Sequence, residues 1–200
     1  MKKNLVVVII LLSSYFTYAA GYKAGDKATD FSLKNIDGKM VSLKDYSSAK
    51  GFIVVFTCNH CPFAKAYESR IIALDNLFAE KGYPVIAINP NDAEKAPEDS
   101  YKNMVDRARE KQYPFPYLYD ESQKTASTYG ATRTPHIYIL QKEKGNLVVK
   151  YIGAIDNNSD DEKLVTDRYA EDAVNALLDG KPVKVSETKA IGCTIKWRNQ

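Results

Sequence analysis

The sequence has little net charge, no internal repeat and no low-complexity run. Its formal net charge is +3 over 200 residues. Two of these positive charges, Lys2 and Lys3, lie in a segment with the pattern of a removable leader, and without them the net charge is +1. The charge therefore indicates neither nucleic acid nor an acidic partner. A chain with 44% hydrophobic and 26% charged residues has the composition of an ordinary globular protein, and its length fits one domain with a sizeable core.

The first residues have the pattern of an export signal. Lys2 and Lys3 precede an apolar run over residues 5–12, and Thr17 and Ala19 are the small residues of a cleavage site. We therefore predict a signal peptide over residues 1–19 and a periplasmic or other extracytoplasmic location. No cysteine that could carry a lipid anchor follows the leader.

An uncleaved membrane anchor is the alternative for the same segment. No charged residue occurs between Lys3 and Lys23, and this span approaches the roughly 17 apolar residues that a membrane helix needs. Ser13, Ser14 and Thr17 interrupt its apolar character. The cleaved signal is therefore the favoured interpretation.

Hydrophobic periodicity predicts a regular series of strands and helices after the leader. Residues 30–43 form two alternating segments around Asp37-Gly38, which is a strong hairpin signal. Residues 51–56 (GFIVVF) form a continuous apolar run, as in a strand buried on both faces. An apolar stripe at helical spacing then follows Pro62 and continues almost to Gly82.

The rest of the chain continues the same alternation. The patterns predict strands at 85–88 and 117–119, a hairpin of 136–140 with 147–152, and helices over 101–108 and 165–178. Asp120 and Gln123 resemble a capping box for a further helix that ends at Gly130. This order predicts an α/β fold with right-handed crossovers. We expect a linker at 20–27, one domain over 28–181 and a C-terminal tail over 182–200.

The chain contains three cysteines, Cys58, Cys61 and Cys193. An exported protein meets an oxidising compartment, so a disulfide is expected. A bond between Cys58 and Cys61 would close a four-residue loop, which constrains the unfolded chain by only roughly 2 kcal/mol. A redox role therefore explains this pair better than a structural one.

The Cys58-Asn59-His60-Cys61 sequence directly follows the 51–56 strand and lies at the start of the next helix. The unpaired amides and partial positive charge of a helix N-terminus stabilise a thiolate. We therefore assign Cys58 as the attacking nucleophile and Cys61 as the more buried resolving thiol. His60 is expected to stabilise the thiolate further, with an exposed turn residue as its alternative, and Asn59 is expected to be a turn residue only.

These motifs resemble the thioredoxin-like superfamily, in the branch of the alkyl-hydroperoxide-reductase and thiol-antioxidant (redoxin) proteins. The resemblance rests on the sequence from Phe56 to Pro62 (FTCNHCP), on Thr134-Pro135 before a later strand, and on the 30–43 hairpin. It implies a thioredoxin-like fold: a central mixed sheet flanked by helices, with an N-terminal β-hairpin and an inserted helix.

The resemblance also implies an activity. It predicts a thiol-disulfide oxidoreductase with a redox-active Cys58–Cys61 disulfide, in which Pro135 is cis and faces the cysteines while Thr134 offers backbone groups to a substrate. The partners would be protein thiols and disulfides, including a membrane or envelope redox partner, and no cofactor or metal is implied. Two departures are Phe52, where thioredoxin has a buried acid, and Thr57, where it has Trp. The proton acceptor for Cys61 is therefore not identified.

Two other functions fit parts of the sequence. A peroxiredoxin-like thiol peroxidase would need Pro and Thr where this chain has Gly51 and Val55. A Cu(I)-binding module could use the cysteine pair with His60 and His136, since thiolate and imidazole suit copper. Strand alternation, however, directs His136 away from the cysteines.

Cys193 is the least explained of the three cysteines. It could be a buried small hydrophobic residue, an exposed thiol that joins exchange, or a half of an intermolecular bridge.

Overall fold

A computed structural model describes residues 21–199 of the chain. The predicted signal peptide over residues 1–19 lies outside this range. Within the described range, no helix combines the length and the apolar character that crossing a membrane requires.

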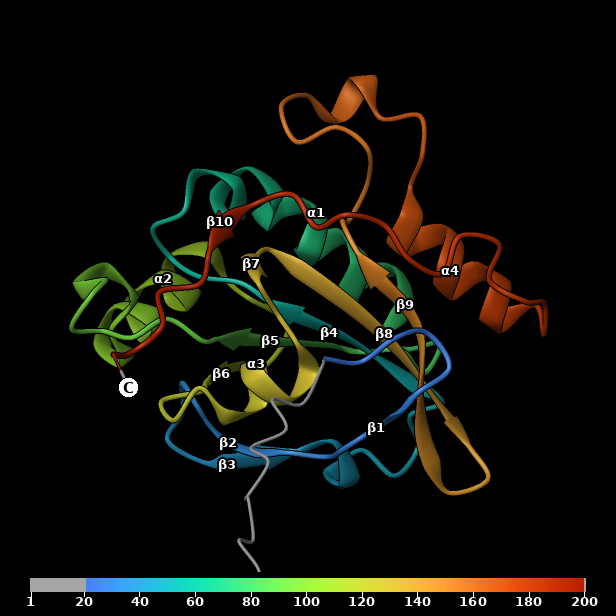
Figure 1. Cartoon of the computed structure of the whole chain (residues 1–200), viewed down its shortest axis with the longest axis horizontal. Coiled ribbons are helices and arrows are strands. Elements are labelled where there is room, and N and C mark those ends of the chain that lie inside the picture. Colours follow the sequence, from blue (N-terminus) through green and yellow to red (C-terminus); the bar gives the residue numbers. More distant parts are fainter. Residues whose placement is uncertain (1–20, 200) are drawn as a thin grey trace, which may run out of the picture.

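A mixed sheet of eight strands forms the centre of the protein (Figure 1). Its strand order is β1-β9-β8-β4-β5-β6-β2-β3. The strands are β1 (Lys27–Ala28), β2 (Ser32–Asn35), β3 (Met40–Ser42), β4 (Gly51–Phe56), β5 (Val85–Asn89), β6 (Tyr117–Tyr119), β8 (His136–Glu143) and β9 (Asn146–Gly153). β4, β5 and β6 are parallel, whereas β8 runs antiparallel to β4. A separate small sheet pairs β7 (Arg133–Thr134) with β10 (Cys193–Thr194) in antiparallel orientation.

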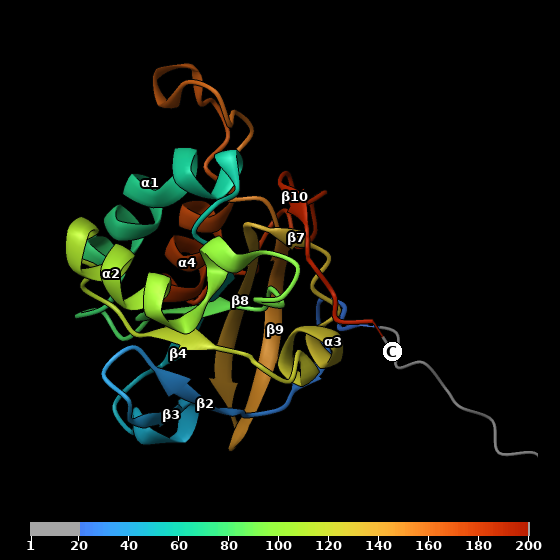
Figure 2. The same cartoon turned by 90° about the vertical axis from the view of Figure 1, so that its left-hand side faces the viewer.

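Four helices cover the two faces of the sheet. They are α1 (Pro62–Phe78), α2 (Tyr101–Lys111), α3 (Lys124–Tyr129) and α4 (Tyr169–Leu178). Figure 2 shows α1, α2 and α4 on one side of the strands and α3 on the other. Short 3₁₀ turns occur at η1 (Leu43–Asp45), η2 (Pro97–Asp99) and η3 (Glu162–Leu164). The arrangement confirms the predicted thioredoxin-like α/β fold.

Strand β4 connects the two halves of the hydrophobic core. Ile53 and Val55 pack into the cluster beneath α1, α2 and α4. Phe52, Val54 and Phe56 point the other way, into the cluster beneath α3. All five side chains are fully buried, because successive residues of a strand face opposite sides of a sheet. The continuous apolar run therefore predicted this strand correctly.

The predicted hairpin and helix starts agree with the structure, with two exceptions. The last helix begins at Tyr169 and not at 165, because Val165 is still extended after η3. Asp120 and Gln123 do not form a capping box, since Gln123 itself has a left-handed backbone with φ of 59°. The Asp120 carboxylate instead accepts a hydrogen bond from the Ala126 amide at 2.8 Å. The two-residue strands β1, β7 and β10 are too short to show any periodicity in the sequence.

A buried ion pair ties α1 to the loop that follows β9 and projects from the fold in Figure 1. Arg70 Nη1 lies 2.7 Å from Asp156 Oδ2, and both side chains are almost completely buried. The Tyr67 hydroxyl donates to the other carboxylate oxygen at 3.0 Å. Arg70 also donates to the Asn158 carbonyl at 2.5 Å. This network satisfies both charges away from water.

We expect Asp156→Ala to lower the free energy of unfolding by about 3 kcal/mol or more, because Arg70 would then keep a buried charge without its partner. Urea unfolding of the oxidised protein measures this loss. The exposed pair of Lys102 and Asp106 provides the control, and Asp106→Ala is expected to change stability little. Equal losses in the two variants would contradict the importance of the buried pair.

Candidate active site

The Cys58-Asn59-His60-Cys61 motif lies between the end of β4 and the start of α1. Cys61 is the residue that precedes the helix, and Pro62 occupies its first position. The Cys61 carbonyl accepts the Lys65 amide at 3.0 Å, as the first turn requires. The sequence predicted this strand-to-helix junction correctly.

Thr134 contacts both cysteines of the motif. The peptide bond between Thr134 and Pro135 is cis, as the family resemblance implies. Cys58 Sγ lies 3.2 Å from the Thr134 hydroxyl oxygen, and Cys61 Sγ lies 3.2 Å from its carbonyl oxygen. β8 starts directly after Pro135 and pairs with β4, which places His136 opposite Phe56 and Thr134 beside the cysteines.

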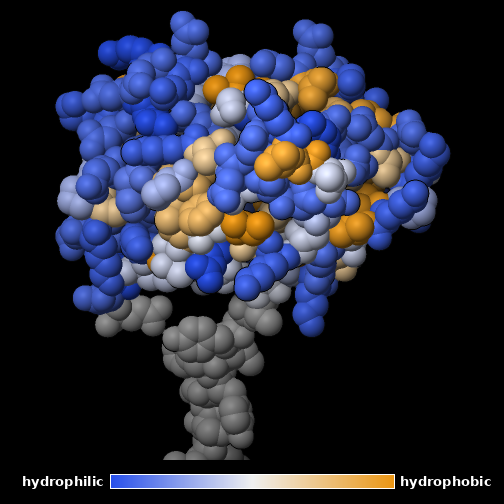
Figure 3. All heavy atoms as spheres, turned by 90° about the horizontal axis from the view of Figure 1, so that it is seen from above, coloured by the Kyte–Doolittle hydropathy of each residue, from blue (hydrophilic) through white to orange (hydrophobic). Residues whose placement is uncertain are grey.

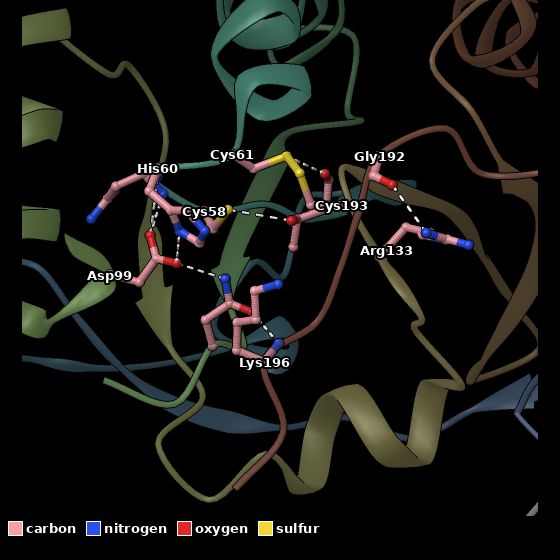
Figure 4. Close-up of a disulfide and its surroundings, with 11 residues drawn as sticks. Cys58, His60, Cys61, Asp99, Arg133, Gly192, Cys193 and Lys196 are labelled. Carbon is pink, nitrogen blue, oxygen red and sulfur yellow. Dashed lines mark hydrogen bonds and ion pairs between the residues drawn. A yellow bond between two sulfur atoms is a disulfide. The ribbon is translucent and has the colours of Figure 1, made fainter. Parts of the chain in front are cut away.

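The disulfide of this structure joins Cys61 to Cys193, and not Cys58 to Cys61 (Figure 4). The two bonded residues are 132 positions apart in the chain, and their Cα atoms are 6.1 Å apart. Cys58 is a free, buried cysteine. The expected Cys58–Cys61 bond is therefore not the one formed in this state. Cys193 is half-buried and bonded within its own chain, so the interpretations as a buried apolar residue and as half of an intermolecular bridge were wrong, and a role in exchange stays a prediction.

The pairing of β10 with β7 explains this bond. It sets Cys193 directly opposite Thr134, and Thr134 is the residue that touches both other cysteines. No local pattern around Cys193 indicates this neighbour, because the bonded cysteines are 132 positions apart in the chain.

Burial raises the pKa of the Cys58 thiol to about 11. Its side chain is 5% exposed, and the negative charge of Asp99 adds to the effect of burial. The Thr134 hydroxyl and the amides of His60 and Cys61 favour the thiolate but do not outweigh these two causes. The expected stabilised thiolate at the helix N-terminus is therefore not present in this state.

Asp99, at the end of η2, is a functional residue that the sequence analysis missed. It is completely buried, and one carboxylate oxygen accepts the amides of Asn59 at 2.7 Å and His60 at 3.2 Å. Its other oxygen lies 2.6 Å from His60 Nδ1 and accepts the side-chain amide of Asn91 at 2.6 Å. This acid contacts the motif directly, whereas Phe52 is buried among apolar side chains. No motif marks Asp99 in the sequence.

His60 and Asn59 are both more than turn residues. The His60 ring is turned onto Asp99, and suitable donor atoms of Cys58, His60 and Asp99 all lie within 4.8 Å of one another. Asn59 is buried, donates to the Glu98 carbonyl at 2.9 Å and accepts the Tyr117 hydroxyl at 3.0 Å. The prediction that Asn59 is only a turn residue was wrong, because its side chain fastens the motif to two neighbouring segments.

His136 lies apart from this group of side chains. It is a buried residue of β8, its Nδ1 accepts the Thr132 amide at 3.3 Å, and its ring lies 4.9 Å from that of Tyr138. Burial lowers its pKa to about 4. It does not belong to the cluster of Cys58, His60 and Asp99, so the two histidines do not form a joint site.

Comparisons with known proteins agree with this geometry. The AhpC/TSA family profile matches residues 24–153. The thiol-disulfide oxidoreductase ResA of Bacillus thuringiensis (strain Al Hakam) is 30% identical over 169 residues, which cover 76% of this chain and 91% of that protein. Among solved structures, an uncharacterized conserved protein from Geobacillus kaustophilus is 41% identical with a TM-score of 0.81, and the match covers 88% of this chain and 93% of that one.

A second solved structure is similar over most of its length. The hypothetical protein SMc02350 from Sinorhizobium meliloti 1021 is 31% identical, with a TM-score of 0.82 and coverage of 90% of this chain and 97% of that one. The fold, the cysteine motif at the start of α1 and the match of the family profile to more than half of the chain lead to one conclusion. The protein belongs to the AhpC/TSA family, the thioredoxin-like redoxin branch that its motifs predicted.

Proposed function

We propose that this protein is a thiol-disulfide oxidoreductase that exchanges disulfides with other proteins through Cys58 and Cys61. The observation that carries the proposal is that the sulfur atoms of Cys58 and Cys61, at the start of α1, both contact Thr134. Two thiols at a helix N-terminus beside a cis-proline edge suit the transfer of a disulfide better than a purely structural bond. The name of the similar Bacillus protein supports the same chemistry.

Starting from the reduced protein, in which Cys61 is not bonded to Cys193, the exchange has two balanced steps. The Cys58 thiolate attacks one sulfur of a substrate disulfide, which forms a mixed disulfide and releases the other substrate sulfur as a thiolate. The Cys61 thiolate then attacks Cys58 Sγ, which frees the substrate and leaves a Cys58–Cys61 disulfide. The substrate gains two electrons and two protons, and the cysteine pair loses them. The same steps in reverse oxidise a substrate, and no diffusible cofactor takes part.

Asp99 and His60 adjust the reactivity of Cys58. Burial is the larger cause of the raised Cys58 pKa, and the Asp99 carboxylate adds to it by disfavouring a second negative charge nearby. His60 Nδ1 lies 2.6 Å from Asp99 Oδ2, so the imidazole ring contacts the same carboxylate that acts on Cys58. His60 therefore acts on Cys58 through Asp99 as well as through its own position within the motif.

Thr134 and Pro135 form the proposed substrate-binding edge. An extended peptide pairs with backbone groups at such an edge, so recognition does not need a specific sequence. The face shown in Figure 3 is mostly hydrophilic, with groups of apolar side chains near its middle. Such a surface supports recognition through backbone pairing more than docking onto a broad apolar patch.

The proposed location is extracytoplasmic, and it rests on the leader pattern of residues 1–19. A protein at this location would exchange electrons with an envelope or membrane redox partner. The peroxidase alternative gains no support from the site, because Val55 is buried in the core where a peroxidase would need a hydroxyl group.

Cys61→Ser is expected to accumulate mixed disulfides on Cys58, because the first step proceeds and the resolving thiol is missing. Non-reducing gel electrophoresis followed by mass spectrometry would identify the trapped proteins. Cys58→Ser serves as the control and should trap nothing at this site. If Cys61→Ser holds no disulfide-linked protein and the wild type also fails to reduce insulin, the proposed function is wrong.

The reactivity of Cys58 should depend steeply on pH. In the oxidised protein, the rate at which iodoacetamide labels Cys58 itself, measured on tryptic peptide 51–65, is expected to rise about tenfold per pH unit from 6 to 10, because the thiolate forms only as the pH approaches the Cys58 pKa of about 11. Asp99→Asn should shift this profile to lower pH, since it removes the neighbouring charge and keeps an oxygen for the amides. A rate that reaches its plateau below pH 8 would contradict the buried, protonated thiol.

A further inference from the structure

The C-terminal segment occupies the edge that a substrate would use. β10 pairs with β7, so that Cys193 lies opposite Thr134 and Thr194 opposite Arg133. The Ile195 amide donates to the Thr132 carbonyl at 3.3 Å, which extends the pairing by one bond. The chain therefore presents to its own active site an extended strand with a cysteine bonded to Cys61. A protein substrate held by a mixed disulfide would also present an extended strand and a bonded cysteine, although its sulfur would be bonded to Cys58 and not to Cys61.

The fit of this strand is close. Gly192 packs directly against the Thr134 carbonyl, and a Cβ atom at position 192 would collide with it. The Arg133 guanidinium donates to the Gly192 carbonyl at 3.3 Å (Figure 4). A larger residue at 192 would push the strand away from the cysteines, so the glycine allows Cys193 to reach them.

The residues after Cys193 are anchored independently of the disulfide. Ile195 is buried in the core cluster beneath α3. The Lys196 amide donates to Asn91 Oδ1 at 2.8 Å, and Arg198 Nε lies 2.6 Å from Asp92 Oδ2. These contacts hold Cys193 near the active site even when its sulfur is not bonded, which gives its thiol a high effective concentration there.

We propose that Cys193 is a third redox cysteine and that residues 192–194 are an internal substrate of the active site. This inference rests on the proposed function of Cys58 and Cys61. The Cys58 thiolate attacks Cys61 Sγ, the Cys61–Cys193 bond breaks, a Cys58–Cys61 bond forms, and Cys193 leaves as a thiolate that takes up a proton. One disulfide replaces another, so the exchange needs no external oxidant or reductant.

The two disulfide isomers have different roles. With Cys61 bonded to Cys193, the strand covers Thr134, and Cys58 is buried and protonated. With Cys58 bonded to Cys61, the motif carries the disulfide that oxidises substrate thiols, and the covalent hold on the strand is gone. A substrate strand can then displace residues 192–194 from β7. The internal exchange therefore couples two events: the disulfide moves from Cys61–Cys193 to Cys58–Cys61, and the backbone of β7 at Thr134 becomes accessible to a substrate.

N-ethylmaleimide can record this exchange in the full, oxidised protein without any substrate. Trypsin is expected to release Cys58 and Cys61 together in peptide 51–65 and Cys193 in peptide 190–196. If the exchange occurs, the reagent captures Cys193, so that peptide 190–196 carries the adduct and peptide 51–65 lacks two hydrogens. If the bond to Cys193 is static, the adduct falls on Cys58, and the two peptides stay cross-linked.

We expect most of the adduct on peptide 190–196 at low reagent concentration. Cys58→Ser is the matched control and should give no adduct on that peptide, because release of Cys193 requires the attacking thiolate. Gly192→Ala should increase the rate at which the adduct forms on Cys193 at least twofold, since the added methyl group weakens the pairing with β7. The fluorescence of Trp197, the only tryptophan of the chain, gives a second readout of movement in this segment.

An adduct found only on Cys58 of the wild-type protein would overturn the inference. This result is independent of the trapping experiment with Cys61→Ser. A positive trap together with a static Cys61–Cys193 bond would leave the proposed function intact and refute the role of Cys193. If Cys61→Ser traps no protein but the Cys61–Cys193 bond still exchanges, the role of Cys193 stands and the proposed exchange with protein substrates is refuted.

Discussion

The site depends on the antiparallel pairing of β4 with β8. Both cysteines of the motif follow the end of β4, and Thr134-Pro135 directly precedes β8. Because the two strands are neighbours in the middle of the sheet, the residues just beyond their paired ends meet at one edge. Cys58, Cys61 and Thr134 are brought within 3.2 Å contacts by this arrangement. The strand β10 then adds to the same edge and brings the third cysteine.

Opposing electrostatic effects act on Cys58 at this edge. The start of α1 and the amides around it favour a thiolate. Burial and the carboxylate of Asp99 favour the thiol, and together they prevail with a pKa of about 11. A cysteine that is kept protonated while the strand covers it is protected from unwanted oxidation. Burial is the larger of the two causes, so movement of the covering strand would lower the pKa of a free Cys58 thiol.

The hydrophobic core explains why the Cys58–Cys61 motif is held firmly, whereas residues 192–194, which cover it, have fewer contacts. The motif follows a strand whose five central side chains are fully buried and precedes a helix whose apolar stripe packs on the same core. Residues 192–194, in contrast, are held by a two-residue pairing and by the disulfide, with firm anchors only after them. The segment is therefore suited to move when its disulfide is exchanged.

The sequence by itself determined the fold class, the strand that leads to the cysteines, the helix that follows them and the cis-proline edge. These features are local or belong to a family motif: an apolar run at 51–56, a helical stripe after Pro62, and Thr134-Pro135 before a strand. The family profile and the thioredoxin-like architecture agree with them. Hydrophobic periodicity and short motifs are sufficient to predict these elements, because each element is specified within a few consecutive residues.

Only the tertiary structure decided which sulfur atoms are bonded, which acid supports the motif, and whether Cys58 is charged. Cys193 and Asp99 reach the site from segments far from it in sequence, and neither lies in a pattern that reveals its neighbours. The pKa of Cys58 likewise depends on how completely the surrounding chain excludes water and on where Asp99 is placed. These are properties of long-range packing, which a one-dimensional pattern does not specify.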